Sequence, residues 1–146
     1  MGYVRYVGYV RAAAMTAAAV ATTVALVGGG GVARAADGEL VPYPGPDAVV
    51  WISEHTGSGG LVSSGLNARL GTEIAVACEG GGSVEVGFEA SGTPGSVPVT
   101  FTLECPAGAV ARRTVQLGDG LSGSFGVQVT ASDGGIRWGL AVLQPE

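Results

Sequence analysis

The chain has 146 residues, which is enough for one domain behind a short N-terminal segment. It contains 12 acidic residues, seven arginines and no lysine, and its formal net charge is −5. This acidic balance disfavours nucleic acid and anionic membrane surfaces as partners, because both carry negative charge. Disorder is excluded, since alternating runs of Val, Ile, Leu and aromatic residues supply apolar surface to bury.

Residues 1–35 have the pattern of a secretory signal peptide. Arg5 and Arg11 form a basic start, residues 12–27 carry no charge, and Ala-Arg-Ala at 33–35 matches a cleavage site. The alternative is an uncleaved membrane anchor, which the scarcity of Leu, Ile and Phe weakens. Cleavage would leave all 12 acidic residues and four arginines, a formal charge of −8. We therefore expect a secreted, extracellular domain that meets a membrane only through this segment, if the segment is retained.

Residues 36–48 predict an extended lead-in to a domain that spans residues 49–146. Proline fixes φ and biases the preceding residue toward extended geometry, and the lead-in contains Pro42, Pro44 and Pro46. A first strand is predicted at 49–53, and the Gly- and Ser-rich residues 56–65 predict a loose loop after it. Residues 66–70 suit either a short strand or a single turn.

Three alternating apolar runs lie between residues 72 and 106, and each places its large side chains on one face of a strand. The inward sets are Ile74, Val76 and Cys78, then Val84, Val86 and Phe88, then Val99, Phe101, Leu103 and Cys105. Three glycines at 80–82 predict a turn after the first run. Pro98 marks the exposed beginning of the third strand, because proline suits strand starts and sheet edges.

The C-terminal part holds three more runs, at 114–117, 125–131 and 136–142. Turn residues at 118–120 separate the first two, and Asp-Gly-Gly at 133–135 predicts a hairpin between the last two. We count about seven strands with turns every eight to twelve residues and no amphipathic helix. This spacing predicts an all-β, antiparallel two-sheet sandwich, either immunoglobulin-like or jelly-roll-like.

The two cysteines of an exported chain predict one disulfide, Cys78–Cys105. If their strands flanked a third strand in one sheet, they would lie roughly 9–10 Å apart. A disulfide needs Cα atoms about 4.4–6.8 Å apart. Either the chain crosses to the opposite sheet within residues 91–96, or the bridge forms beyond the strand ends. We favour the crossing, because both cysteines face inward.

Candidate catalytic groups are few, and we predict neither an enzyme nor a cofactor. His55 is the only histidine, and its nearby serines are Ser58, Ser63 and Ser64. No G-x-S-x-G motif accompanies them and no lysine can replace the base, so a solvated histidine is the better interpretation. One histidine and a disulfide pair cannot complete a four-ligand metal site. The outward acids Glu85 and Glu89 are better explained as a solvated face than as a glycosidase pair.

Tyr43 and Trp51 form the best candidate ligand-binding patch. Both lie near the stiff proline segment, and exposed aromatic side chains serve as binding anchors. The alternative is that Trp51 covers one end of the core. Trp138 is in register with the inward residues of the last run, so we expect it in the core beside the disulfide.

Short patterns at Cys78–Val86, Glu104–Gly108 and Asp133–Leu140 resemble small secreted β-sandwich proteins of high-GC actinobacteria. The resemblance covers residues 70–143 and implies a secreted, disulfide-bonded β-domain, with no active site to carry over. We therefore predict a secreted, non-enzymatic binding or structural module whose partner is an unknown protein or glycan. The alternative is an inhibitor of an extracellular hydrolase that presents residues 56–65, and a secreted hydrolase is the weakest hypothesis.

Overall fold

Eight strands and no helix make up residues 39–146, which are the residues that this computed structural model describes. The predicted all-β class is confirmed, with one strand more than the count from the sequence. In chain order the strands are β1 (Ala48–Thr56), β2 (Gly59–Leu66), β3 (Thr72–Glu79), β4 (Gly82–Glu89), β5 (Val99–Cys105), β6 (Ala111–Gly118), β7 (Gly123–Ala131) and β8 (Arg137–Leu143).

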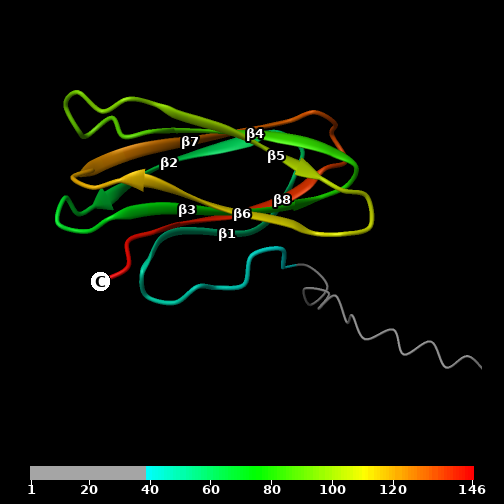
Figure 1. The fold of residues 1–146 in the computed structure, drawn as a ribbon, viewed down its shortest axis with the longest axis horizontal. Coiled ribbons are helices and arrows are strands. Elements are labelled where there is room, and N and C mark those ends of the chain that lie inside the picture. Colours follow the sequence, from blue (N-terminus) through cyan, green and yellow to red (C-terminus); the bar gives the residue numbers. More distant parts are fainter. Residues whose placement is uncertain (1–38) are drawn as a thin grey trace, which may run out of the picture. The chain divides into compact units, whose positions relative to one another are not determined.

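The strands form two four-stranded antiparallel sheets, as Figure 1 shows. The first sheet has the order β1-β8-β3-β6 and the second has the order β2-β7-β4-β5. Only β4 and β5 are neighbours both along the chain and within a sheet, so every other connection passes from one sheet to the other. Eight strands connected in this way make a jelly roll, which decides between the two sandwich types that the sequence allowed.

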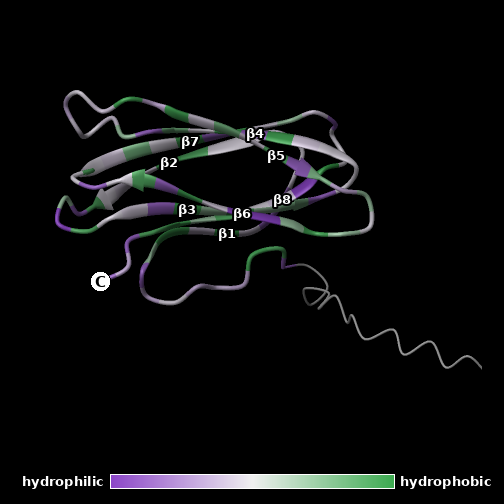
Figure 2. Ribbon diagram, in the orientation of Figure 1, coloured by the Kyte–Doolittle hydropathy of each residue, from purple (hydrophilic) through white to green (hydrophobic). Residues whose placement is uncertain are grey.

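The core between the sheets consists of the side chains that the alternating runs placed inward. Hydropathy alternates along the strands (Figure 2), with the apolar residues of both sheets facing each other. Trp138 is buried, pairs with Cys78 across β8 and β3, and donates its indole N–H to the Gly57 carbonyl at 2.6 Å. The predicted core position of this tryptophan beside the disulfide is confirmed.

The disulfide joins Cys78 at the end of β3 to Cys105 at the end of β5, with a Cα–Cα distance of 5.2 Å. The bond is confirmed, and it links the two sheets as expected. The predicted place of the crossing is wrong. The chain changes sheets at Gly80 and Gly81, whereas residues 91–96 belong to the one connection within residues 39–146 that joins two strands of the same sheet.

The crossing at residues 80–81 depends on backbone geometry that glycine adopts readily. Gly80 has φ +127° and Gly81 has φ +82°, a region that other residues enter only with strain. Their amides donate to the Pro106 and Cys105 carbonyls, which ties the crossing to the second cysteine. The turn at 133–135, predicted as a hairpin, likewise connects different sheets, because β7 and β8 lie on opposite sides of the core.

The segment predicted as a loose loop at 56–65 is largely strand β2. A Gly- and Ser-rich sequence is typical of a loop, but here backbone pairing with β7 holds the segment as a strand without large side chains. Leu61 pairs with Val127, and the exposed Val62 pairs with Gly126. The inhibitor hypothesis required a loop at residues 56–65 that is presented to a partner, and most of this segment is a strand instead.

The lead-in packs on the outer face of the first sheet. Leu40 and Val41 are buried against Ala77 and Ala141. The amides of both lead-in residues donate to the carbonyl of Ser53 in β1, at 3.0 and 3.2 Å. Residues 39–47 therefore form a strap, held by apolar contact and by hydrogen bonds to an edge strand.

The predicted signal peptide, residues 1–35, lies outside the described residues. Within residues 39–146, no helix is long and apolar enough to span a membrane.

Candidate functional site

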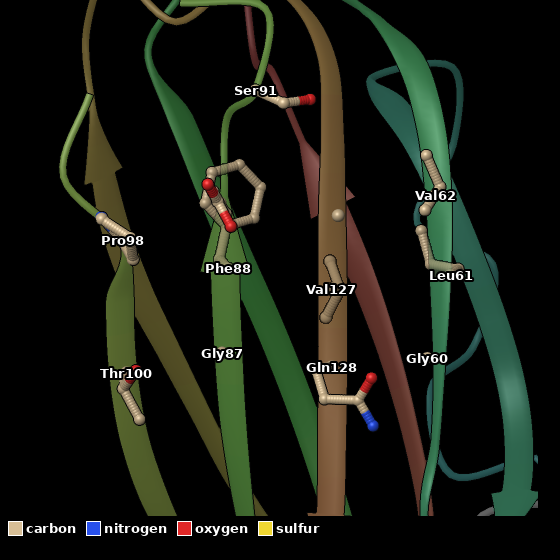
Figure 3. A pocket seen from close by; sticks show the side chains of 12 residues that line it. Gly60, Leu61, Val62, Gly87, Phe88, Ser91, Pro98, Thr100, Val127 and Gln128 are labelled. Carbon is tan, nitrogen blue, oxygen red and sulfur yellow. The ribbon is translucent and has the colours of Figure 1, made fainter. Parts of the chain in front are cut away.

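A groove of about 720 Å³ lies on the outer face of the second sheet. Figure 3 shows it from Thr100 on β5 and Pro98 just before that strand, across β4 and β7, to Val62 on β2. All four strands of the sheet contribute. Its lining consists of Gly60, Leu61, Val62, Gly87, Phe88, Glu89, Ser91, Pro98, Thr100, Gly126, Val127 and Gln128.

The groove exists because glycines alternate with longer side chains on this face. Strand register places Gly60, Gln128, Gly87 and Thr100 in one row across the four strands. In the neighbouring row, Gly126 lies between Val62 and Glu89 in the same way. The missing side chains at Gly87 and Gly126 leave depressions bounded by their neighbours.

Space at two of these glycines is open. A Cβ at Gly87 would approach no atom closer than 4.0 Å, and one at Gly126 none closer than 3.8 Å. Neither residue has a positive φ, so the fold would tolerate a side chain at both positions. The glycines at 87 and 126 therefore shape the groove without being required by the backbone.

Gly60 differs, because its neighbour Gln128 lies over it. A Cβ at Gly60 would lie 2.8 Å from the Val127 carbonyl and 2.9 Å from Oε1 of Gln128. The amide of Gln128 donates from Nε2 to the Gly59 carbonyl at 3.0 Å. This bond fixes the glutamine side chain in the groove and leaves its Oε1 as an acceptor for a ligand.

The groove offers polar hydrogen-bonding groups and negative charge. Thr100 supplies an exposed hydroxyl and Glu89 an exposed carboxylate, and no lysine or arginine lines it. Glu85 is also exposed, on the same face of β4. An anionic ligand would be repelled here, whereas hydroxyl groups of a neutral ligand would find both donors and acceptors.

The predicted aromatic pair is brought together by the strap. The rings of Tyr43 and Trp51 have centroids 5.2 Å apart in an edge-to-face arrangement. Tyr43 is 61% exposed and Trp51 is 37% exposed. The indole N–H of Trp51 donates to the Val41 carbonyl at 2.8 Å, so the strap holds this ring in place. Trp51 does not join the core, and the binding role of the pair stays a prediction.

The histidine and serines do not assemble a nucleophilic site. The ring of His55 packs on Trp138 with centroids 5.0 Å apart. Oγ of Ser58, in the turn between β1 and β2, accepts a hydrogen bond from the amide of Ala131 at the end of β7. Among residues 39–146, no group of three or more His, Cys, Asp or Glu side chains is arranged to hold a metal ion.

An ion-pair cluster connects three neighbouring strands of the first sheet. Arg137 on β8 contacts Glu54 on β1, with Nε 2.6 Å from Oε1, and Glu79 on β3. The hydrogen bond from Arg137 holds the pKa of the Glu54 carboxyl below its usual value. Both carboxylates are thereby engaged in holding strands together.

The sequence did not reveal the groove residues as a set. Gly60, Gly87, Gly126 and Gln128 come from β2, β4 and β7, and β7 lies between the other two in the sheet although it is distant from both in the chain. The usable signal was glycine at outward positions inside strands, which marks a close approach or a depression.

No family model matches the chain, and no curated protein sequence matches it. Among solved structures, a carbohydrate-binding module from Cellvibrio mixtus lichenase 5A, in complex with cellotriose, is 18% identical with a TM-score of 0.35. The match covers 68% of this chain and 93% of the module. A protein of the disulfide-linked pili of Bacillus endospore appendages is 15% identical, with a TM-score of 0.31 and coverages of 66% and 85%. At TM-scores this low, neither likeness bears on ligand or activity.

Proposed function

We propose that this domain is a secreted, non-enzymatic module that binds a neutral polysaccharide chain in the groove of the second sheet. The observation that carries the proposal is the groove itself, which crosses all four strands and has a volume of about 720 Å³. Ligand sites are commonly of this size and combine an apolar floor with a few fixed polar groups.

The chemistry of the lining favours a glycan over a protein. Oε1 of Gln128, the hydroxyl of Thr100 and the carboxylate of Glu89 match the hydroxyl groups of a sugar chain. Protein partners usually anchor large aromatic or arginine side chains in deep pockets, whereas this groove runs across all four strands of the sheet. The carboxylate also selects against uronic acids, sulfated glycans and phosphates.

A depletion assay with insoluble polysaccharides tests the proposal. The mature domain is mixed with neutral polymers (cellulose, xylan, mannan and a mixed-linkage glucan) and with an anionic one (polygalacturonate). We expect retention on at least one neutral polymer and none on the anionic polymer. Gly87→Gln fills the groove and is expected to lower the affinity at least tenfold, which is a loss of about 1.4 kcal/mol or more.

The matched control is Gly134→Gln, since Gly134 also has open space around it but lies in the β7–β8 turn. Both variants should unfold at the wild-type denaturant midpoint. If the two variants bind equally well, or if no neutral polymer retains the wild type, the groove is not the binding site. Tyr43→Ala, at an exposed ring outside the groove, reports separately whether the aromatic pair contributes.

A further inference from the structure

The jelly roll leaves four strands at sheet edges, and they are not protected equally. The edges are β1 and β6 in the first sheet and β2 and β5 in the second. An edge strand presents unpaired N–H and C=O groups that another strand can join, and proteins usually block such edges.

Three of the four edges carry a blocking device. The strap bonds to β1 at Ser53. Arg113 donates from Nη1 to the Thr102 carbonyl of β5 at 3.1 Å, and Pro98 directly precedes that strand. Strand β6 carries the consecutive arginines 112 and 113, whose charge discourages pairing.

Strand β2 carries none of these three devices, and its one irregularity, a register shift in the pairing with β7 between Ser63 and Leu66, lies beyond Val62. Its eight residues, Gly-Gly-Leu-Val-Ser-Ser-Gly-Leu, include no charge and no proline. Among residues 39–146, β7 is the only strand that pairs with it. Val62, in the middle of the strand, is 84% exposed. An uncharged, exposed edge with an apolar side chain at its centre is the kind that recruits another strand.

We propose that a second copy of this chain occupies the β2 edge, with the two β2 strands antiparallel about a two-fold axis near Val62. A two-fold axis requires a self-complementary strip. Elsewhere, two copies of a chain this acidic would repel each other, whereas β2 meets its copy with no charge on either side. The pairing places each Val62 opposite the other, and the contact between the two side chains shields part of each from water, which favours association.

The pairing would join the two second sheets into one continuous sheet of twice the width. Because Gly60, Leu61 and Val62 also line the groove, the two grooves would lie side by side on one surface. This consequence rests on the proposed function. Two grooves on one rigid surface raise the apparent affinity for a polymer, since the second contact becomes intramolecular.

Sedimentation equilibrium of the mature domain, without any ligand, tests the pairing separately from the groove. We expect the mass to approach twice that of the monomer as concentration rises from micromolar to millimolar. Val62→Lys should stay monomeric, because it places like charges opposite each other in the pair. Val97→Lys is the matched control, since Val97 is 80% exposed but precedes β5 on the opposite edge.

A wild-type domain that stays monomeric throughout this range overturns the proposal, whatever the groove binds. Dimers that persist in Val62→Lys overturn it as well. Oxidation of Val62→Cys then reports the register, because residues opposite each other on paired strands lie within disulfide distance. We expect a covalent dimer from Val62→Cys and none from Val97→Cys, and the reverse result would overturn the assignment to β2.

Discussion

Arg137 shows how one side chain coordinates three strands of this domain. It stands on β8 between β1 and β3, and it contacts Glu54 on one side and Glu79 on the other. The arrangement is partly exposed, so each ion pair adds only modestly to stability. Its effect on the Glu54 carboxyl is nevertheless measurable, because the hydrogen bond from Arg137 lowers the pKa of that group.

Arg137→Gln should raise the pKa of Glu54 back toward its ordinary value, because the hydrogen bond that lowers it is lost, and an NMR pH titration measures this change. A carboxyl whose pKa is lower in the folded state stabilises the fold above its unfolded pKa, and this contribution is lost as pH falls through the folded pKa. The difference in unfolding free energy between wild type and Arg137→Gln should therefore shrink on acidification. Arg69→Gln, at an exposed turn residue, should show no such pH dependence.

At the scale of elements, the connections decide the fold more than the strands do. Alternating runs define most of the strands, yet the jelly roll arises because all but one connection crosses between the sheets. The β3–β4 crossing uses two glycines with positive φ in succession, Gly80 and Gly81. This short connection brings the chain from Cys78 across the core edge, so that Cys105 can meet it from the opposite sheet.

Gly80→Ala should be clearly destabilising, for two separable reasons. The positive φ costs an L-residue roughly 1–2 kcal/mol, and the new Cβ would lie 3.1 Å from the Ile136 Cα and 3.3 Å from the Gly135 carbonyl. Gly108→Ala isolates the first cost, since Gly108 has φ +75° and nothing within 4 Å of its Cβ. In urea unfolding, Gly80→Ala should lose more unfolding free energy than Gly108→Ala. Equal losses would show that the close contacts of a Cβ at Gly80 add no cost of their own.

Strands with a buried alternating face were predictable, whereas the strand order and the edge strand were not. The face of β3 with Ile74, Val76 and Cys78 is buried as expected, because period-2 apolar residues can bury together only on a strand. Strand β2 has little side-chain signal, since five of its eight residues are Gly or Ser. Turn residues indicate that the chain reverses direction, but they do not indicate whether the next strand joins the same sheet or the opposite one. For this reason the predicted crossing between sheets at residues 91–96 was wrong.

The candidate site illustrates the same limit at the level of the whole molecule. Tyr43 and Trp51 were recognisable because they are close in sequence and aromatic. The groove requires Gly60, Gly87 and Gly126 to become neighbours through strand pairing, and each alone reads as an ordinary strand glycine. A groove formed where side chains are missing can be recognised only once the pairing of the strands is known.

The disulfide acts on the whole molecule, because it cross-links the two sheets in addition to the backbone connections between them. It joins β3 of the first sheet to β5 of the second, and both cysteines are buried, with Cys78 directly opposite Trp138 on β8. Since the two residues are 27 positions apart, the bond restricts the unfolded chain considerably. The loop-entropy relation gives a stabilisation of roughly 3–4 kcal/mol for a loop of this length.

The double variant Cys78→Ala/Cys105→Ala should therefore lose roughly 3–4 kcal/mol of unfolding free energy, measured by guanidinium denaturation against the oxidised wild type. Alanine is preferable to serine, because both sites are buried and a buried hydroxyl adds a desolvation cost of its own. If the bond acts through the unfolded state, the variant should also unfold with a steeper denaturant dependence, since its unfolded chain exposes more surface. A loss below about 1 kcal/mol, with an unchanged dependence of the unfolding free energy on denaturant concentration, would mean that packing between the sheets stabilises this sandwich without the disulfide.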